Sequence, residues 1–246
     1  MTPYEQAVQT ELIRWQQAMQ KPPSTFGRLS TSVQKRINRI IPDRIHALIT
    51  ATIKQMTRAV LFGVDFLNRP PVAGQTLIQR DAAVARRIEF YKKTSAAEGG
   101  VTGAGGILLG LADFPLLLSL KMKMLFEIAS LYGYSASDYR ERVFILYVFQ
   151  LAFSSQERRQ VVYQHIANWP EHSRQLPNDI NQFDWLTFQQ EYRDYIDLAK
   201  MAQLIPGIGA AVGIVVNYRL VNQLGQTAMN AYRMRLLQDS PALLRE

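Results

Sequence analysis

Apolar residues recur at helical spacing from the start of the chain. Thr2 and Glu5 form a capping box in which Pro3 suits the first helical position, and Pro22 ends the pattern. Between these signals, the apolar positions lie three or four residues apart: Val8, Leu12, Trp15 and Met19. The pattern predicts an N-terminal amphipathic helix.

Helical spacing continues along the rest of the chain. A second stretch runs from Asp43 towards Leu67, with a stripe at Ile45, Leu48, Thr52, Met56, Ala59 and Gly63. Thr76 and Gln79 indicate the start of a helix that ends at 91–93. No run alternates with period two between turn signals, so the fold class predicted is all-α.

The later part of the chain has its own start and stop signals. Ser154 and Glu157 resemble a capping box for a helix that Pro170 ends. Residues 170–182 are polar and contain a Pro-Asn-Asp sequence, which is typical of a loop.

Two segments, 99–118 and 204–217, are both apolar and rich in glycine. A glycine inside a helix costs about 1 kcal/mol relative to alanine, so this many glycines need a reason. Their spacing of three or four puts them on helical faces that allow close backbone approach: Gly99, Gly103, Gly106 and Gly110 in the first segment, Gly209 and Gly213 in the second. We therefore predict a multi-helix bundle with two central glycine-rich apolar helices.

Two other interpretations of these glycines are weaker. The glycine motifs of nucleotide-binding loops are absent, and no strand precedes either segment. A membrane hairpin is the other alternative. A straight helix over 104–120 would be about 25 Å long, short of the ~30 Å hydrocarbon core, and Asp113 and Pro115 interrupt it.

Asp113 and Asn217 extend the glycine faces of the two segments. Three hypotheses remain open for them. The two side chains pair in the core and fix how the helices cross, or they form a polar spot in a central pocket. Alternatively, Asp113 caps a helix that starts at Pro115.

The amino-acid composition excludes several kinds of functional site. The 246 residues include 0 cysteines, which excludes disulfides, thiolate catalysis and cysteine metal sites. Of the 3 histidines, His165 and His172 are separated by Pro170 and are predicted to be isolated polar residues. The acidic set Glu191, Asp194 and Asp197 is interpreted as a solvated helix face. We predict no catalytic, metal-binding or cofactor-binding residue and expect no cofactor.

Positive charge is concentrated near the N-terminus. Residues 1–93 hold 15 Lys/Arg and 6 Asp/Glu, a balance of +9, whereas the rest of the chain holds 13 and 14. Lys35, Arg36 and Arg39 interleave with apolar residues at Val33, Ile37 and Ile40. This pattern favours attachment to an anionic membrane surface. Nucleic acid is a weaker partner, because neither a helix-turn-helix pattern nor an aromatic stacking platform accompanies the cluster.

The glycine-rich stretch that runs into Ala112-Asp113-Phe114-Pro115, followed by Tyr132-Gly133-Tyr134, resembles the EcsC family of bacterial proteins. A later stretch from Ile205 to Gly213, followed by Asn217 and an amphipathic C-terminal helix, is similar to that family as well. The resemblance covers about residues 80–240. It implies a mostly helical bacterial protein, encoded in some genomes beside an ABC transporter.

The chain is expected to consist of basic amphipathic helices over 1–75 and an EcsC-like helical core over 76–246, forming one continuous unit. Because no signal peptide precedes the first helix, the expected location is the cytoplasm or the inner face of the plasma membrane. The function that we predict is that of a non-enzymatic accessory or binding protein at this surface, with anionic lipid or a membrane protein such as a transporter as partner. The alternatives are a protein that inserts its glycine-rich hairpin into the bilayer, and a hydrolase with an unrecognised site.

Overall fold

The computed structural model is all-helical and has no strand in the part of the chain that it describes. That part comprises residues 2–22, 43–62, 70–103, 106–155, 158–184, 186–188 and 210–239, with the side chains of 43–46, 96–103, 106–113 and 210–216 excepted. Its helices are α1 (Pro3–Gln20), α3 (Asp43–Phe62), α4 (Leu77–Gly103), α5 (Gly106–Leu131), α6 (Tyr139–Phe153), α7 (Arg159–Ala167), α8 (Trp169–Gln175), the short 3₁₀ helix η1 (Ile180–Gln182) and α11 (Ala210–Asp239).

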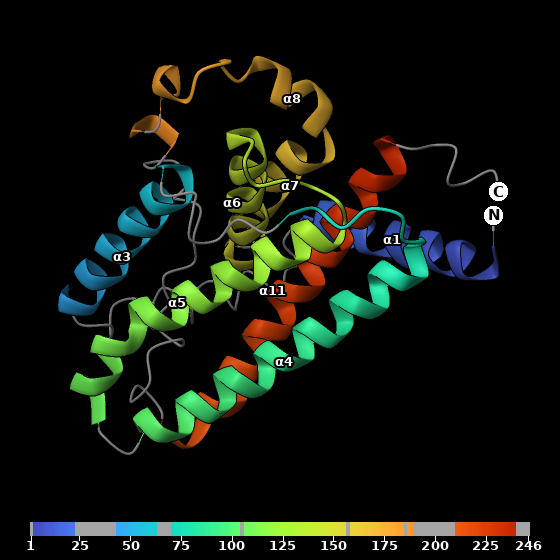
Figure 1. Ribbon diagram of the computed structural model, residues 1–246. Helices are drawn as coiled ribbons and strands as arrows, with labels where there is room; N and C mark the ends of the chain where they lie inside the picture. Colours follow the sequence, from blue (N-terminus) through green and yellow to red (C-terminus); the bar gives the residue numbers. More distant parts are fainter. Residues whose placement is uncertain are drawn as a thin grey trace.

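The C-terminal helix α11 packs against helices that are far apart in the sequence. It contacts α4 along much of its length, and it also contacts α1, α5, α6 and α7. In Figure 1, α4, α5 and α11 are long rods that run alongside one another, while α3 lies on the other side of α5. The helices α4 and α5 are antiparallel, because Asp81 near the start of α4 contacts Tyr132 just beyond the end of α5.

The N-terminal helix follows the sequence prediction. The Glu5 backbone N–H donates to Thr2 Oγ1 over 3.3 Å, and the Thr2 N–H donates to Glu5 Oε2 over 2.8 Å, which completes the capping box. Val8 and Leu12 are buried, and the helix ends at Gln20, just before Pro22 and Pro23.

The helix α6 lies in the interior of the fold. Asp138 caps it by accepting a hydrogen bond from the Arg140 N–H over 2.9 Å. Fourteen residues are buried, all those of α6 except Arg140. A helix that is apolar on most sides is stable only when other helices surround it. Val8 of α1 and Ile53 of α3 belong to the same hydrophobic core as α6, although the division into 1–75 and 76–246 stays a prediction.

The end of α5 is a Schellman motif that positions two tyrosines. The Gly133 N–H donates to the carbonyl of Ser130 over 3.0 Å, and the Tyr134 N–H donates to that of Ala129 over 3.0 Å. Gly133 has φ +94°, a conformation that glycine adopts without steric cost. The motif sends Tyr132 and Tyr134 back towards the helical core.

Three of the predicted boundaries are wrong. The helix α4 continues past 91–93 to Gly103 because α5 and α11 pack against it. Ser154 ends α6 instead of starting α7, since its hydroxyl donates to the carbonyl of Gln150 over 2.6 Å. Pro170 lies in the first turn of α8, where its missing N–H costs nothing, so 169–175 is helix and not loop.

The glycine-rich segments are arranged differently from the prediction. Gly99 and Gly103 belong to α4, whereas Gly106 and Gly110 belong to α5. Because α4 and α5 are antiparallel, the four glycines do not form one continuous helical face. Gly213 lies in α11, and Gly209 lies outside the described residues. The surroundings of these glycines are not described, so their role in close helix packing stays a prediction.

The described close approach between α4 and α11 occurs at a different glycine. A Cβ atom added to Gly225 would lie 2.6 Å from Cγ1 of Ile88, far inside the ordinary contact distance. Gly225 therefore lets the backbone of α11 pack directly on an α4 side chain. Sequence reasoning missed this position, since a lone glycine has no periodic pattern.

Candidate functional site

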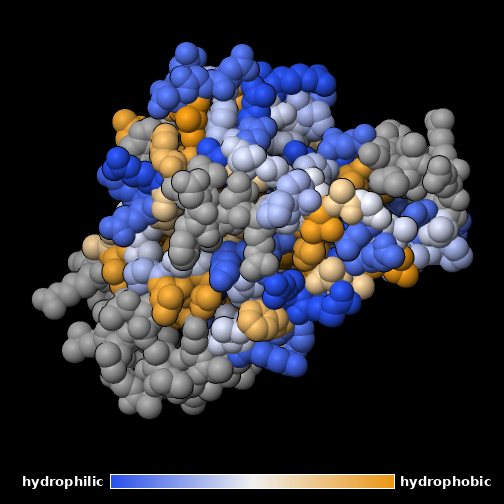
Figure 2. Space-filling view, viewed as in Figure 1, coloured by the Kyte–Doolittle hydropathy of each residue, from blue (hydrophilic) through white to orange (hydrophobic). Residues whose placement is uncertain are grey.

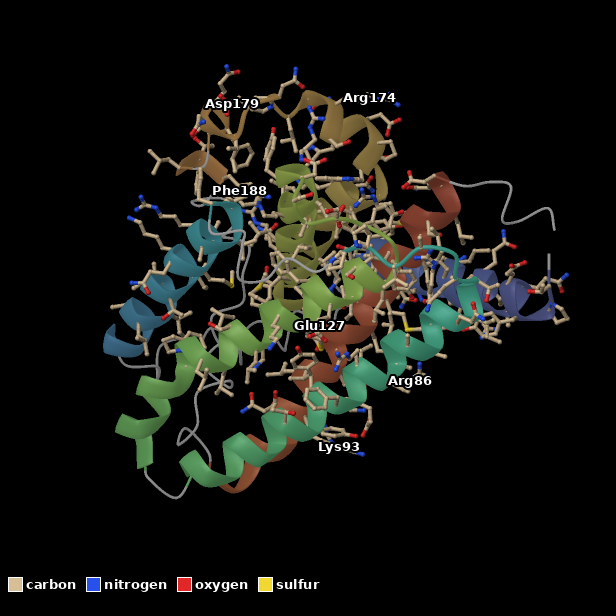
Figure 3. The ribbon with its side chains drawn as sticks, viewed as in Figure 1. Arg86, Lys93, Glu127, Arg174, Asp179 and Phe188 are labelled. Atoms are coloured by element: carbon tan, nitrogen blue, oxygen red, sulfur yellow. The ribbon has the colours of Figure 1, made fainter. Side chains whose placement is uncertain are left out.

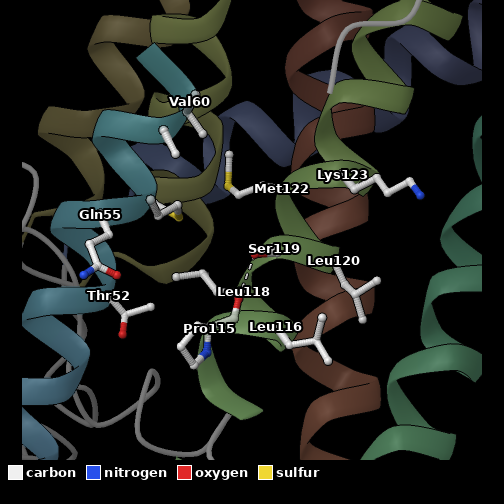
Figure 4. A pocket seen from close by; sticks show the side chains of 12 residues that line it. Thr52, Gln55, Val60, Pro115, Leu116, Leu118, Ser119, Leu120, Met122 and Lys123 are labelled. Carbon is white, nitrogen blue, oxygen red and sulfur yellow. Dashed lines mark hydrogen bonds between the residues drawn. The ribbon is translucent and has the colours of Figure 1, made fainter. Parts of the chain in front are cut away.

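An apolar groove lies between α3 and α5. Its volume is about 470 Å³, within the range of about 300–1,000 Å³ typical of small-molecule sites. Figure 4 shows the side chains of both helices around it. The lining residues are Thr52, Gln55, Met56, Ala59, Val60, Pro115, Leu116, Leu118, Ser119, Leu120, Met122 and Lys123.

The outer side of α5 combines apolar and basic side chains. Leu116 is 56% exposed, although it is a large apolar residue, and Lys123 is exposed two turns further along the helix. Among the described side chains of α3, the charged ones are Lys54 and Arg58, both exposed. Figure 2 shows hydrophobic patches next to strongly hydrophilic ones on the face that includes α5. Among the described side chains of α3 and α5 there is no exposed carboxylate.

A second, shallower hollow lies on the other side of α5, between α5 and α4. Its volume is about 280 Å³, and Arg86, Arg87, Phe90 and Leu131 are among its lining residues. Arg87 Nε lies 3.1 Å from Oε2 of the buried Glu127. Figure 3 places Glu127 between the helices, with Arg86 and Lys93 further out along α4. Glu127 is thus turned inward, so the exposed charged side chain among those described on α5 is the cation Lys123.

A buried carboxylate near the start of α4 joins four elements of the fold. Asp81 accepts hydrogen bonds from the hydroxyls of Tyr132 (2.5 Å) and Tyr4 (2.7 Å) and from Nε of Arg233 (3.0 Å). These residues, with Glu11, are called the Asp81 network; they come from α1, α4, the end of α5 and α11. Burial, followed by the hydrogen bond to Asp81, raises the pKa of Tyr4 from 10.0 to about 12.

A second network joins α6 to α11. Glu141 accepts a hydrogen bond from the Tyr232 hydroxyl (2.6 Å) and one from Arg235 (2.5 Å). The Arg235 guanidinium also lies 4.0 Å from the ring centroid of Tyr134, whose hydroxyl donates to Asp239. Burial alone would lower the pKa of Arg235, but attraction to Glu141 outweighs it, and the pKa is raised. Each network is built around a buried ion pair between residues that are distant in the sequence. Sequence patterns, which are local, do not reveal such pairs.

The two histidines are not isolated, contrary to the prediction. Although Pro170 places them on different helices, α7 and α8 bring the rings of His165 and His172 to a centroid distance of 4.8 Å. Tyr147 stacks on His165, and its hydroxyl lies 3.2 Å from Nε2 of His172. Burial, followed by repulsion from His165, lowers the pKa of His172. Within the described residues, no group of three His, Asp or Glu side chains could hold a metal ion.

Several predicted site residues lie where the structure describes little or nothing. Lys35, Arg36 and Arg39 fall outside the described residues, as do Glu191, Asp194 and Asp197. Asp113 lies inside α5, which begins at Gly106, so the hypothesis that it caps a helix starting at Pro115 is wrong. Its side chain is not described.

Asn217 is 1% exposed, and neither polar atom of its amide has a hydrogen-bond partner among the described residues. Burying an amide removes its hydrogen bonds to water, and this costs free energy of folding unless other groups replace them. The pairing of Asn217 with Asp113 stays a prediction.

None of the helices in the described part of the chain has a stretch that is both long and apolar enough to span a bilayer. A model of the EcsC protein family matches residues 6–237, and so includes α1 as well as the core. The chain belongs to the EcsC family. The match extends further towards the N-terminus than the motif resemblance over about 80–240.

Two relatives from Bacillus subtilis (strain 168) are similar to this EcsC-family protein. The protein named "Protein EcsC" is 42% identical over 236 residues, which cover 96% of this chain and 97% of the relative. The "Uncharacterized protein YdbA" is 32% identical over 150 residues, covering 60% of this chain and 55% of the relative. No solved structure matches the chain.

The Tyr132-Gly133-Tyr134 motif, which contributed to the family resemblance, acquires a physical role from the structure. Gly133 allows the Schellman turn, Tyr132 reaches Asp81, and Tyr134 reaches Asp239. The rings of Tyr132 and Tyr232 stack at a centroid distance of 5.7 Å, which connects the two buried networks. In this EcsC-family protein, the motif therefore locks α5 onto α4 and α11.

Proposed function

We propose that this EcsC-family protein is a non-enzymatic accessory protein that binds the anionic inner surface of the plasma membrane through the face formed by α3 and α5. The observation that carries the proposal is the combination on this face of an apolar groove, an exposed leucine and exposed cations, with no exposed carboxylate among the described side chains of either helix. Peripheral membrane proteins bind by such a pairing of apolar burial with attraction to anionic lipids.

The distribution of charge along the chain supports the same surface. Lys35, Arg36 and Arg39 precede the first residue of α3, Asp43, by only four to eight positions. The basic segment is therefore tethered to the helix that forms one wall of the groove. A cation near an anionic membrane contributes about 1 kcal/mol, so several together produce stable attachment.

Binding to lipid vesicles tests the proposal. The full-length protein is expected to co-sediment with vesicles that contain phosphatidylglycerol and not with vesicles of phosphatidylcholine alone. Replacing Lys35, Arg36 and Arg39 by glutamine should weaken binding strongly, and Lys123→Gln should weaken it by roughly fivefold, as expected for about 1 kcal/mol per charge. Raising the salt concentration should release the protein, because salt screens exposed charges.

Arg174→Gln is the matched control. Arg174 is an exposed cation on α8, far from the α3–α5 face in Figure 3, so its loss removes the same charge from another part of the molecule. Binding that is equal for Lys123→Gln and Arg174→Gln would contradict the proposed face. Association that resists high salt would instead support the alternative in which the glycine-rich hairpin inserts into the bilayer.

A further inference from the structure

The groove between α3 and α5 is elongated along the helices. Thr52, Met56 and Val60 line it at intervals of four along α3, and Pro115, Ser119 and Met122 do so along α5 at intervals of four and three. At about 1.5 Å of rise per residue, the α3 wall from Thr52 to Val60 is about 12 Å long. The two helices thus offer two turns each to a linear ligand.

The chemistry of the lining is nearly all apolar. The Ser119 hydroxyl donates to the carbonyl of Pro115 within its own helix over 2.8 Å, so its proton is not offered to a ligand. Met56 and Met122 lie on opposite walls, and their unbranched side chains adapt to ligands of varied shape. Thr52 and Gln55 are the other uncharged polar residues of the lining.

This lining suits an alkyl chain better than a peptide or a polar metabolite. An extended peptide brings a row of N–H and C=O groups that need partners when buried, and the groove has few to offer. An alkyl chain requires only contact with apolar surface, and burying it is favourable in proportion to the area removed from water. The elongated shape and the adaptable methionines fit such a chain.

The positive charge of Lys123 at the edge of the groove favours a ligand with a negative head group. Among the described residues that line the groove, Lys123 is the only charged one, and none is a carboxylate. In Figure 4 the Lys123 side chain leaves α5 on the side away from α3, the same side as Leu116 and Leu120. Lys123 is nevertheless a lining residue and is exposed, so a head group that leaves the groove on this side of α5 would lie near an ammonium group. This arrangement is complementary to a negative head group.

We propose that the groove between α3 and α5 binds the acyl chain of a single anionic lipid, with the head group beside Lys123. The inference rests on the proposed membrane-surface function and names the ligand for the same face. One tail held in the groove would add a stoichiometric, chain-length-dependent contact to the diffuse electrostatic attraction of the basic residues.

The chain has 0 cysteines, so Ser119→Cys introduces a unique thiol in the groove of the full-length protein. Labelling this thiol with a polarity-sensitive fluorophore reports when an acyl chain enters. Ser137→Cys is the matched control, because Ser137 is also an exposed serine but lies in the connection between α5 and α6, outside the groove. The probe lipid is lysophosphatidylglycerol below its micelle concentration, with lysophosphatidylcholine and glycerol 3-phosphate as comparisons.

The labelled Ser119→Cys variant should show a saturable blue shift at one equivalent of lysophosphatidylglycerol, whereas the labelled Ser137→Cys variant should show none. Lysophosphatidylcholine should bind more weakly, and glycerol 3-phosphate, which has no tail, should not bind. By calorimetry on unlabelled protein, Ser119→Trp should lose most of the binding while Ser137→Trp retains it. Lys123→Gln should lower the affinity for lysophosphatidylglycerol by roughly fivefold and that for lysophosphatidylcholine very little.

Absence of saturable lipid binding would overturn the proposal, and so would equal lipid affinity of Ser119→Trp and the parent protein. A third such result is a dimer in solution whose formation, without lipid, shifts the fluorescence of the labelled Ser119→Cys variant. The third would mean that a second copy occupies the groove. Vesicle binding without binding of monomeric lipid would sink the groove proposal and leave the membrane-surface proposal standing. Binding of monomeric lipid without vesicle binding would contradict the membrane-surface proposal and leave the groove proposal standing.

Discussion

Buried carboxylates in this protein are satisfied by phenols as well as by arginines. Asp81 accepts two tyrosine hydroxyls and one guanidinium, and Glu141 accepts one of each. A buried carboxylate needs such donors to replace the water that it loses. The tyrosines are affected in turn, because ionising a phenol beside a carboxylate would bring two negative charges together.

The pKa of Tyr4 predicts how stability depends on alkaline pH. The folded pKa of about 12 lies above the ordinary value of 10.0, because of burial and the hydrogen bond to Asp81. The stabilisation that this shift represents is therefore fully present below pH 10, and it is lost as the pH rises through about 12. In an ultraviolet titration of the folded protein, subtracting the Tyr4→Phe curve from the parent curve should leave one phenol that ionises near pH 12. A difference step near pH 10 would mean that Tyr4 does not contact Asp81 in solution.

At the scale of elements, the crossing of α4 and α11 depends on one small residue. Gly225 of α11 faces Ile88 of α4 at a distance that leaves no room for a methyl group. Lys92 and Tyr218 form a cation–π contact further along the same pair of helices, with Nζ 4.4 Å from the ring centroid. Replacing a helical glycine by alanine usually stabilises a helix by about 1 kcal/mol, so here propensity and packing act in opposite directions.

Gly225→Ala is expected to destabilise the protein, because overpacking typically costs about 1–3 kcal/mol and outweighs the gain in helix propensity. Urea unfolding measures the change. Ile88→Ala alone should destabilise through the cavity that it leaves, by about 2–5 kcal/mol. In the double variant the new methyl at 225 occupies part of that cavity, so the two effects should not add. Additive losses, or a stabilised Gly225→Ala, would contradict the close crossing.

At the scale of the whole molecule, α11 connects the N-terminal helix to the rest of the fold. Arg233 is 5% exposed and binds both Asp81 of α4 and Glu11 of α1, while Arg235 binds Glu141 of α6. Helices that are distant in sequence are thus joined through two arginines near the end of α11. The α3–α5 face rests on this framework, since α5 packs on both α4 and α11.

Asp81→Asn should therefore lower the global stability and not only loosen one contact. The substitution leaves the buried Arg233 without its buried carboxylate, and breaking such a pair typically costs about 3–5 kcal/mol. Glu11→Gln is the matched control, because Glu11 binds the same arginine but is 55% exposed, and it should cost less than about 1 kcal/mol. Equal effects of the two substitutions on the urea midpoint would mean that burial of Asp81 is not what makes the pair important.

Local signals in the sequence determined the helical class and several helix ends. The Thr2–Glu5 capping box and the prolines at 22 and 23 act within a few residues of the chain, so the first helix was predicted with its buried Val8 and Leu12. The family could also be identified from short motifs, since residues such as Gly133 have a backbone requirement that few other residues meet.

Only the tertiary structure decided which residues meet across the fold. The reversal between α4 and α5 separates glycines that look periodic in the sequence, and α7 and α8 bring together two histidines that Pro170 keeps on different helices. The α3–α5 groove likewise has no sequence signal, because Ser119 and Met56 become neighbours only when two helices pack. Helix formation depends on neighbours a few residues apart, whereas a groove or a buried ion pair depends on how distant faces are matched to exclude water. The way in which the helix faces pack therefore determines that α4 and α11 cross closely at Gly225, that Asp81 is buried and that Leu116 is exposed.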